Sequence, residues 1–310
     1  MLSKELRIIY MGTPEFAVEP LRRLVDGGYK VVAVVTMPDK PSGRGLKLTP
    51  SAVKEYALSQ GLKVLQPEKL RDEEFLEQMK NLNLDLGIVV AFKMLPTVVW
   101  SLPKLGTFNL HASLLPQYRG AAPINWAIMN GDAESGITTF MLNKEIDTGD
   151  IISVKRVSIS KDETAGMLHD KLMIEGGDLV IKSVDMIAEG KRDYTPQDTI
   201  TKGIDLRPAP KIFKDDCRID WTKDLDFIYN KVRGLSPYPA AWFEHNGISY
   251  KVFDVSCENN KHDMPFGNIV SDNKTFIKIA CNGGYIQINE LQMAGKKRMK
   301  TKDFLLGNKI

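Results

Sequence analysis

The stretch LRIIYMGTPEFAVEPLRRLVDGGYKVVAVVT, residues 6–36, places a strand, a helix and a second strand in close succession. Residues 6–11 and 31–36 are short apolar runs of the kind that forms buried strands. Between them, Thr13 and Pro14 resemble the cap and first residue of a helix, and the Gly27–Gly28 pair resembles its end. Strands joined by a helix usually pair in parallel, so this stretch predicts a parallel sheet.

The same alternation continues downstream. Residues 63–67, 84–92 and 106–112 read as further strands, with a helical pattern at 72–81, and a long amphipathic helix is expected over 163–190. We therefore expect an α/β fold over residues 1–190, with a Rossmann-like, doubly wound and mostly parallel sheet. Ligands of such sheets bind at the carboxyl ends of the strands.

Residues 191–208 interrupt this pattern with prolines and polar residues, and we interpret them as a linker. Beyond them, residues 209–310 contain one helical segment and several short alternating runs separated by Gly and Asn turns. This pattern predicts a second, smaller domain, an OB-like β-barrel.

Composition narrows the function classes. The 310 residues have a formal net charge of +3 and three cysteines without a C-x-x-C pair, which disfavours zinc and a disulfide framework and fits a cytoplasmic protein. No apolar run approaches the length of a membrane span. Neither G-x-G-x-x-G nor a P-loop motif occurs, so dinucleotide and P-loop nucleotide binding are unsupported.

One candidate for chemistry is Asn109-x-His111. Two residues apart on a strand, these side chains point to the same face, where an amide could donate to a carbonyl oxygen and an imidazole could move a proton. Asp147, in the run EIDTGD, could orient the imidazole. Spacing leaves open that His111 only makes local hydrogen bonds and that Asp147 only forms a turn.

The segment SLLPQYRG, residues 113–120, follows the histidine directly. Pro116 restricts Leu115 to extended geometry, and an apolar segment with free main-chain groups could clamp a flat heteroaromatic ligand. A plain connection between a strand and a helix is the alternative. Arg119 could bind an acid or brace the loop.

Together these motifs resemble the folate-dependent formyltransferases. The resemblance covers MGTPEFAV (11–18), residues 36–57, NLHASLLPQYRGAAPINWAI (109–128) and IDTGDII (146–152), and extends to RIDW (218–221) and residues 290–305. It implies transfer of a formyl group from 10-formyltetrahydrofolate to the α-amino group of methionyl-initiator tRNA, for translation initiation. It further implies catalytic roles for Asn109, His111 and Asp147, without a metal. The folate-binding residues it implies are Ser113, Leu114, Leu115 and Pro116.

The resemblance also implies a tRNA partner. The loop at 37–51 would reach the acceptor arm with Lys40, Arg44 and Lys47. Residues 209–310 hold 16 Lys and Arg against 12 Asp and Glu, and the excess gathers in KKRMKTK, residues 296–302. Lys296, Lys297 and Arg298 are therefore expected to contact phosphates, although both segments could simply be solvated surface. We expect a monomer.

Three other functions share these features. An amino-sugar formyltransferase or a 10-formyltetrahydrofolate hydrolase would use the same N-x-H motif, turn and aspartate, but would not need the basic loop at 37–51. A non-catalytic RNA-binding protein would not need Asn109, His111 and Asp147.

Overall fold

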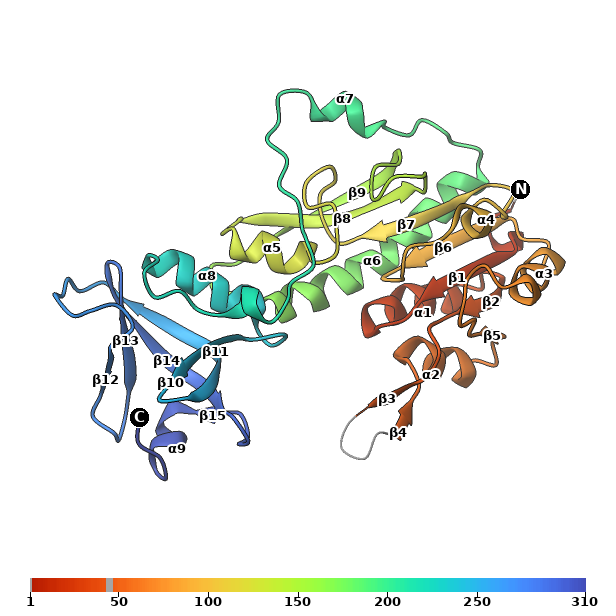
Figure 1. Ribbon diagram of the computed structural model, residues 1–310. Coiled ribbons are helices and arrows are strands. Elements are labelled where there is room, and N and C mark those ends of the chain that lie inside the picture. Colours follow the sequence, from red (N-terminus) through yellow and green to blue (C-terminus); the bar gives the residue numbers. More distant parts are fainter. Residues whose placement is uncertain (1, 43–46) are drawn as a thin grey trace. The chain divides into compact units, whose positions relative to one another are not determined.

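A computed structural model describes residues 2–42 and 47–310 of the chain, so Arg44 lies outside the described residues. Within them, a seven-stranded sheet has the order β5-β2-β1-β6-β7-β8-β9 (Figure 1). β1 pairs in parallel with β2 and β6, β6 with β7, and β2 with β5, whereas β8 runs antiparallel to β7. The strands are β1 Ile8–Gly12, β2 Val31–Val35, β5 Val64–Leu65, β6 Leu86–Val90, β7 Thr107–His111, β8 Glu134–Met141 and β9 Ile151–Ser158. The predicted mostly parallel sheet is confirmed.

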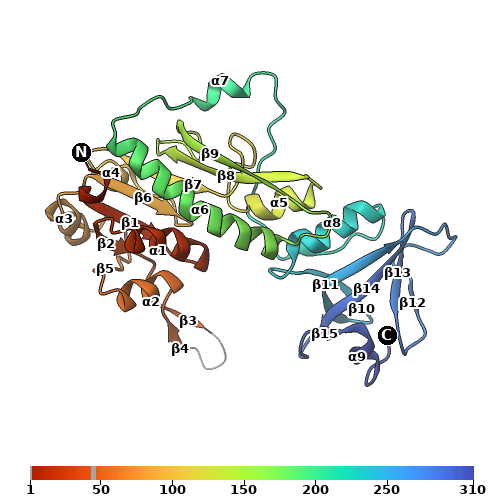
Figure 2. The same ribbon diagram turned by 180° about the vertical axis from the view of Figure 1, so that it is seen from behind.

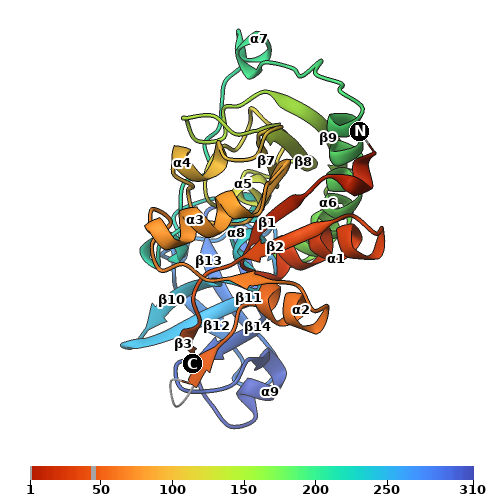
Figure 3. The same cartoon turned by 90° about the vertical axis from the view of Figure 1, so that its right-hand side faces the viewer.

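Helices cover both faces of this sheet. α3 (Glu73–Asn81) and α4 (Thr97–Trp100) lie on one side, and α1 (Val18–Asp26) and α6 (Ala165–Ala188) on the other (Figure 3). On the α3 and α4 side, Phe75, Met79 and Val99 pack against Ile9 and Val89 in one buried cluster. Burying apolar side chains on both faces supplies the main driving force for this three-layer arrangement.

The long helix α6 is seated closely on β7 and β8 (Figure 2). A Cβ atom at Gly176 would lie 2.8 Å from the end of the Leu110 side chain of β7, so a larger residue here would require that side chain to shift. Further along the helix, the buried hydroxyls of Ser183 and Thr139 share a hydrogen bond of 2.7 Å. α6 therefore packs against β7, the strand that carries Asn109 and His111, and against its neighbour β8.

The described chain forms two compact units. One comprises residues through Arg119, Gly136–Val157 and Asp170–Pro208, and the other comprises Gly120–Ser135, Ser158–His169 and Ala209–Ile310. α5 (Pro123–Met129) belongs to the second unit, where it packs against α8 (Leu225–Leu235). The units are therefore not consecutive in sequence, and domain boundaries at 190 and 208 stay a prediction.

The second unit contains an antiparallel sheet in the order β10-β11-β14-β13-β12, with β15 paired to β14. Its alternate residues face a core that includes Ile228 of α8 and Phe304 of α9. The predicted second, smaller β-barrel-like domain is confirmed, with the helices α8 and α9 contributing to its core. Its elements are β10 Ala241–His245, β11 Ile248–Glu258, β12 Ile269–Ser271, β13 Ile277–Cys281, β14 Gly284–Met293, β15 Met299–Lys300 and α9 Thr301–Leu305.

Three local features differ from or add to the sequence expectations. Thr13 makes no helix cap: a 3₁₀ turn at Glu15–Ala17 precedes α1, and the buried Thr13 hydroxyl has no hydrogen-bond partner in the described residues. The basic loop at 37–51 contains a hairpin of β3 (Lys40–Ser42) and β4 (Lys47–Thr49). The predicted linker contains a short helix, α7 (Gln197–Thr201).

Candidate functional site

The two residues of the N-x-H motif both lie in β7. Asn109 and His111 are two positions apart on a regular strand, so they share a face at the carboxyl end of the last parallel strand in the sheet. His111 is buried, with 7% of its side chain exposed. The sequence prediction of a common face is therefore correct, and the face lies where open α/β sheets bind ligands.

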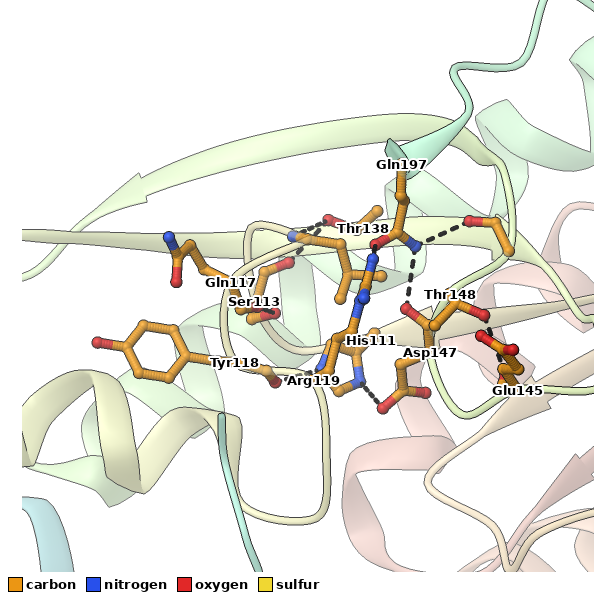
Figure 4. A network of polar contacts seen from close by, with 12 residues as sticks. His111, Ser113, Gln117, Tyr118, Arg119, Thr138, Glu145, Asp147, Thr148 and Gln197 are labelled. Carbon is orange, nitrogen blue, oxygen red and sulfur yellow. Dashed lines mark hydrogen bonds and ion pairs between the residues drawn. The ribbon is translucent and has the colours of Figure 1, made fainter. Parts of the chain in front are cut away.

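Both ring nitrogens of His111 face acceptors (Figure 4). Nε2 lies 2.9 Å from the main-chain oxygen of Tyr118, and Nδ1 lies 3.8 Å from Oδ2 of Asp147. The edge of the ring also contacts Phe140, with ring centres 6.5 Å apart. An Nε2–H can donate to the carbonyl, whereas the 3.8 Å separation at Nδ1 is too long for a hydrogen bond to the carboxylate. The predicted approach of Asp147 to His111 is present, at ion-pair distance.

Asn109 brings an unsatisfied polar group into this site. Its Oδ1 atom is buried and has no hydrogen-bond partner among residues 2–42 and 47–310. Buried polar atoms in proteins nearly always have a partner, so an orphan of this kind indicates the place of a ligand atom. A half-turn of the amide exchanges its oxygen and nitrogen, and the group can then donate instead of accept.

Asp147 sits on a loop of unusual backbone conformation. Its φ angle is +54°, in the left-handed region, and 13% of its side chain is exposed. Two residues on, a Cβ atom at Gly149 would lie 1.7 Å from the main-chain oxygen of Met141, so the loop crosses the end of β8 in direct backbone contact. This close backbone contact restricts the position of the loop and therefore the position of the Asp147 carboxylate relative to the His111 ring.

The SLLP segment forms a tight turn against β8. The Thr138 hydroxyl donates to the Ser113 oxygen at 2.7 Å and accepts from the Leu115 N–H at 3.2 Å, and the Ser113 hydroxyl donates to the oxygen of Gln117. The Leu115–Pro116 peptide is cis, and Leu115 is 5% exposed. The Ser113 oxygen and the Leu115 N–H are thus already bonded within the protein and are not free for a ligand. A role of the segment in folate binding stays a prediction.

Two contributors to the site were missed by sequence reasoning. One is the carbonyl of Tyr118, which no side-chain motif can reveal. The other is Gln197, which is 2% exposed and binds both Arg119 and the main chain of the Asp147 loop. The sequence around Gln197 has no hydrophobic periodicity, so it predicts a linker and gives no sign of a site residue. The predicted bracing role of Arg119 is the one the structure favours.

The basic residues of the 37–51 loop are only partly described. Lys40 begins β3 and is exposed, Lys47 begins β4, and Arg44 lies between them outside the described residues. The Asp39 carboxylate accepts from Lys54 at 2.6 Å and from Gln66 at 2.8 Å, and these bonds lower the pKa of Asp39. Asp39, the acidic residue of this loop, is therefore already bonded to Lys54 and Gln66.

The basic residues of the second unit lie on its surface. Lys296 and Lys297 are exposed at the turn between β14 and β15. Arg298 is engaged instead: it pairs with Glu290 at 2.5 Å and its guanidinium lies 4.3 Å from the centre of the Phe253 ring. Of the three predicted phosphate ligands, Arg298 would have to share its charge with Glu290.

Two kinds of feature, a metal-binding cluster of side chains and a membrane-spanning helix, are absent from the described residues. No three or more His, Cys, Asp or Glu side chains are grouped there in a way that could hold a metal ion. Nor does any helix in that part of the chain have the length and apolar character needed to cross a membrane.

A mostly parallel, doubly wound sheet with an asparagine, a histidine and an aspartate meeting at one strand end defines an α/β protein equipped for acyl transfer. Comparison with known proteins gives the family. The family model described as formyl transferase matches residues 6–184, and that of the formyl transferase C-terminal domain matches residues 211–309. The chain belongs to the formyl transferase family, and the resemblance seen in the sequence is confirmed.

Curated relatives match over the full length. The methionyl-tRNA formyltransferase of Phocaeicola vulgatus is 58% identical, covering 99% of this chain and 97% of the relative. That of Parabacteroides distasonis is 56% identical, covering 100% and 98%.

Solved structures share the fold at lower identity. An N-formyltransferase from Helicobacter canadensis, in complex with folinic acid and dTDP-3-aminofucose, is 20% identical with a TM-score of 0.67, covering 95% of this chain and 100% of its own. HypX from Aquifex aeolicus, in complex with tetrahydrofolic acid, is 18% identical with a TM-score of 0.66, covering 97% and 47%.

Proposed function

We propose that the protein transfers the formyl group of 10-formyltetrahydrofolate to the α-amino group of methionyl-initiator tRNA. The observation that carries this proposal is the approach of Asp147 to His111 at the end of β7, with Asn109 two residues earlier on the same face of the strand and its buried Oδ1 without a hydrogen-bond partner in the described residues. Curated methionyl-tRNA formyltransferases at 56% and 58% identity over nearly their whole length support the choice of acceptor.

The chemistry follows from the residue types. The deprotonated amine attacks the formyl carbon, a carbon–nitrogen bond forms, and the bond from that carbon to N10 breaks. Asn109 donates to the oxygen as it gains negative charge, and His111 adds a second donor. His111 then delivers a proton to the departing N10 from Nδ1, because Nε2 is hydrogen-bonded to the oxygen of Tyr118 at 2.9 Å. Nδ1 lies 3.8 Å from the Asp147 carboxylate and is not held in a close hydrogen bond to it. The acceptor amine loses the proton that N10 gains, so the overall reaction needs no other reactant.

The folate would lie along the SLLP segment. Ser113, Leu114, Leu115 and Pro116 are proposed to form the folate-binding turn beside His111. Ser113 and Leu115 are only 0% and 5% exposed and Pro116 is buried, so Leu114 would supply most of the apolar contact. An apolar wall suits the flat face of a pterin ring, and polar contacts to its edge would come from elsewhere. Asn109 would bind the formyl oxygen.

The tRNA would be held mainly through its phosphates. Lys40, Arg44 and Lys47 are proposed to contact the acceptor arm from the 37–51 loop, and Lys296, Lys297 and Arg298 to contact the backbone from the second unit. Contacts of this type position a nucleic acid without reading its sequence. We propose further that the protein works as a monomer in the cytoplasm, without a metal.

The test is an assay of formyl transfer from 10-formyltetrahydrofolate with charged initiator tRNA, uncharged tRNA, a nucleotide-linked amino sugar, or no acceptor. We expect turnover only with the charged tRNA. Turnover on the amino sugar would identify a sugar formyltransferase, and release of formate without an acceptor would identify a hydrolase. Binding of tRNA without any turnover would indicate a non-catalytic RNA-binding protein.

A further inference from the structure

The His111 ring is held from two sides, and both holding points are themselves braced by residues 195–207. Nε2 faces the oxygen of Tyr118, and Nδ1 faces the carboxylate of Asp147. Both of those residues have a positive φ angle, +60° at Tyr118 and +54° at Asp147. Non-glycine residues are uncommon in this conformation and are usually held in it by surrounding contacts, although aspartate adopts it more readily than most. The bracing contacts therefore decide where the imidazole lies.

On the Tyr118 side, the bracing comes from residues 205–207. The N–H of Tyr118 donates to the oxygen of Arg207 at 2.7 Å. The Gln117 amide accepts from the Arg207 N–H at 2.9 Å and donates to the oxygen of Asp205 at 2.9 Å. On this side the bracing consists of main-chain contacts and the half-buried side chain of Gln117.

On the Asp147 side, the bracing comes from one buried side chain, that of Gln197 (Figure 4). Its Nε2 donates to the main-chain oxygens of Asp147 at 3.0 Å and Gly149 at 2.8 Å. Its Oε1 accepts from Nε and Nη2 of Arg119 at 3.1 and 2.6 Å. Two donors and two acceptor lone pairs are the whole hydrogen-bonding capacity of a glutamine amide, and all are used.

Gln197 is in turn held in place by its own chain. Two residues before it, Thr195 exchanges both main-chain hydrogen bonds with Ile151, at 2.8 and 2.9 Å. Ile151 opens β9, so the segment is anchored to the sheet at the point where the Asp147 loop rejoins it. A buried amide anchored in this way ties the Asp147 loop to Arg119, the residue next to Tyr118.

From these contacts we propose that Gln197 is a positioning residue for the formyl transfer put forward above, which this inference takes as given. Gln197 touches neither the imidazole nor the carboxylate. It acts through the main chain of Asp147, by holding the loop in the left-handed conformation that directs the carboxylate at Nδ1 of His111. Arg119 completes the tie, and residues 195–197 form part of the site rather than a spacer between two domains.

The primary test replaces Gln197 with Met, which keeps the volume and removes all four hydrogen bonds. A misplacement of catalytic groups by about 1 Å can lower a rate about a hundredfold, so we expect kcat to fall between about tenfold and a hundredfold. KM for charged tRNA and for 10-formyltetrahydrofolate should stay within a factor of about two, since Gln197 is 2% exposed and its amide is fully bonded within the protein. The neighbouring exposed Asp198 supplies the matched control, and Asp198→Asn should behave as the wild type does.

A double-mutant cycle separates positioning from general support. In an Asp147→Asn background the carboxylate is already lost, so adding Gln197→Met should lower kcat by no more than about twofold. If the two losses instead multiply, Gln197 acts independently of Asp147 and the proposal is overturned. The same conclusion follows if Gln197→Met leaves kcat unchanged, or if it raises both KM values and leaves kcat intact.

Gln197→Glu resolves which half of the amide matters. A carboxylate keeps the acceptor for Arg119 but cannot donate to the oxygens of Asp147 and Gly149. We expect Gln197→Glu to be as slow as Gln197→Met, and wild-type turnover would refute the claim that the Asp147 loop is held from this side. If Gln197→Met fails to fold by thermal unfolding, Gln197→Glu takes its place in the cycle. Absence of tRNA-dependent turnover in the wild type would count against the proposed function alone.

Discussion

The end of β7 and the basic turn at residues 296–302 both carry residues with proposed roles, but the two regions hold their polar side chains differently. At β7, His111 is 7% exposed and lies between a carbonyl and a carboxylate, and the turn beside it is tied to Thr138. In the basic turn, Lys296 and Lys297 are exposed to solvent. One region is a buried polar network, and the other is a set of surface charges.

This difference indicates what each region can do. Buried hydrogen bonds fix atoms in advance of the substrate, as stabilisation of developing charge requires. Surface lysines attract a polyanion from a distance and are screened by salt. We therefore expect single substitutions to be severe at the end of β7 and graded in the basic turn. The following predictions test that contrast, from the largest effect to the smallest.

His111→Asn should have the largest effect. It removes the group proposed to deliver a proton to N10, and general acid–base catalysis contributes about 10²–10⁴-fold, so kcat should fall by that order. Single-turnover formylation with charged tRNA would measure the loss, and thermal unfolding would verify that the variant is folded. Turnover near that of the wild type would remove His111 from the mechanism.

Asn109→Ala should follow closely. The loss of one donor to a developing oxyanion typically lowers a rate about 10²–10³-fold. The affinity for a non-reactive folate analogue, measured by titration calorimetry, should change much less than kcat. An equal loss in both would mean that Asn109 binds the ground state and the transition state alike.

Thr138→Val should lower the free energy of unfolding, because it removes the hydrogen bonds that hold the SLLP segment against β8. The Thr138 hydroxyl satisfies the buried oxygen of Ser113 and the N–H of Leu115, and leaving such groups unpaired costs about 1–3 kcal/mol. Urea unfolding would give the difference in the free energy of unfolding. Thr138→Ser keeps the hydroxyl and should restore most of it, whereas a neutral Thr138→Val would show that the turn is held by its apolar contacts.

Replacing both Lys296 and Lys297 by Ala should weaken tRNA binding without lowering the rate at saturating tRNA. The slope of log K against log salt is negative, and its magnitude should decrease by about one for each lysine that contacts a phosphate. Filter binding over a salt series provides the measurement, with the exposed Lys261 and Lys274 replaced together by Ala as a control of equal charge change. An unchanged slope would place the tRNA on another surface.

Glu290 should give the smallest effect. The hydrogen bond from Arg298 lowers the pKa of Glu290 below its unfolded value, so the carboxylate stabilises the fold above about pH 4.3 and less as the pH falls through the folded pKa. The pair is partly exposed to solvent, and its contribution should be below about 1 kcal/mol. Unfolding of the wild type and of Glu290→Gln between pH 6 and 3 would test this, with the flatter profile expected for Glu290→Gln.

Much of this arrangement follows from sequence periodicity. The alternation of apolar runs and helices predicted the sheet, and spacing by two predicted that Asn109 and His111 share a face. The approach of Asp147 to His111 could be posed only as a hypothesis. It depends on the antiparallel pairing of β8 with β7 across a connection that includes α5, which no local pattern encodes.

The rest depends on contacts that have no local signature. Gln197 lies 50 residues from Asp147 and meets it through main-chain oxygens, which are the same for every residue type. Thr13 looks like a helix cap by composition, yet a 3₁₀ turn follows it and its hydroxyl makes no cap bond. Propensity at such positions is overruled by tertiary packing.

The backbone at Asp147 has a consequence for which residues can occupy this position. In the left-handed region asparagine and aspartate are favoured over other residues with a side chain, and of these two only aspartate carries a negative charge. Chain geometry and reaction chemistry therefore make the same choice by separate criteria. Glutamate would keep the charge but lose the fit to the turn, whereas asparagine would keep the turn but lose the charge. A substitution of Asp147 by either residue would therefore lose the backbone fit or the negative charge.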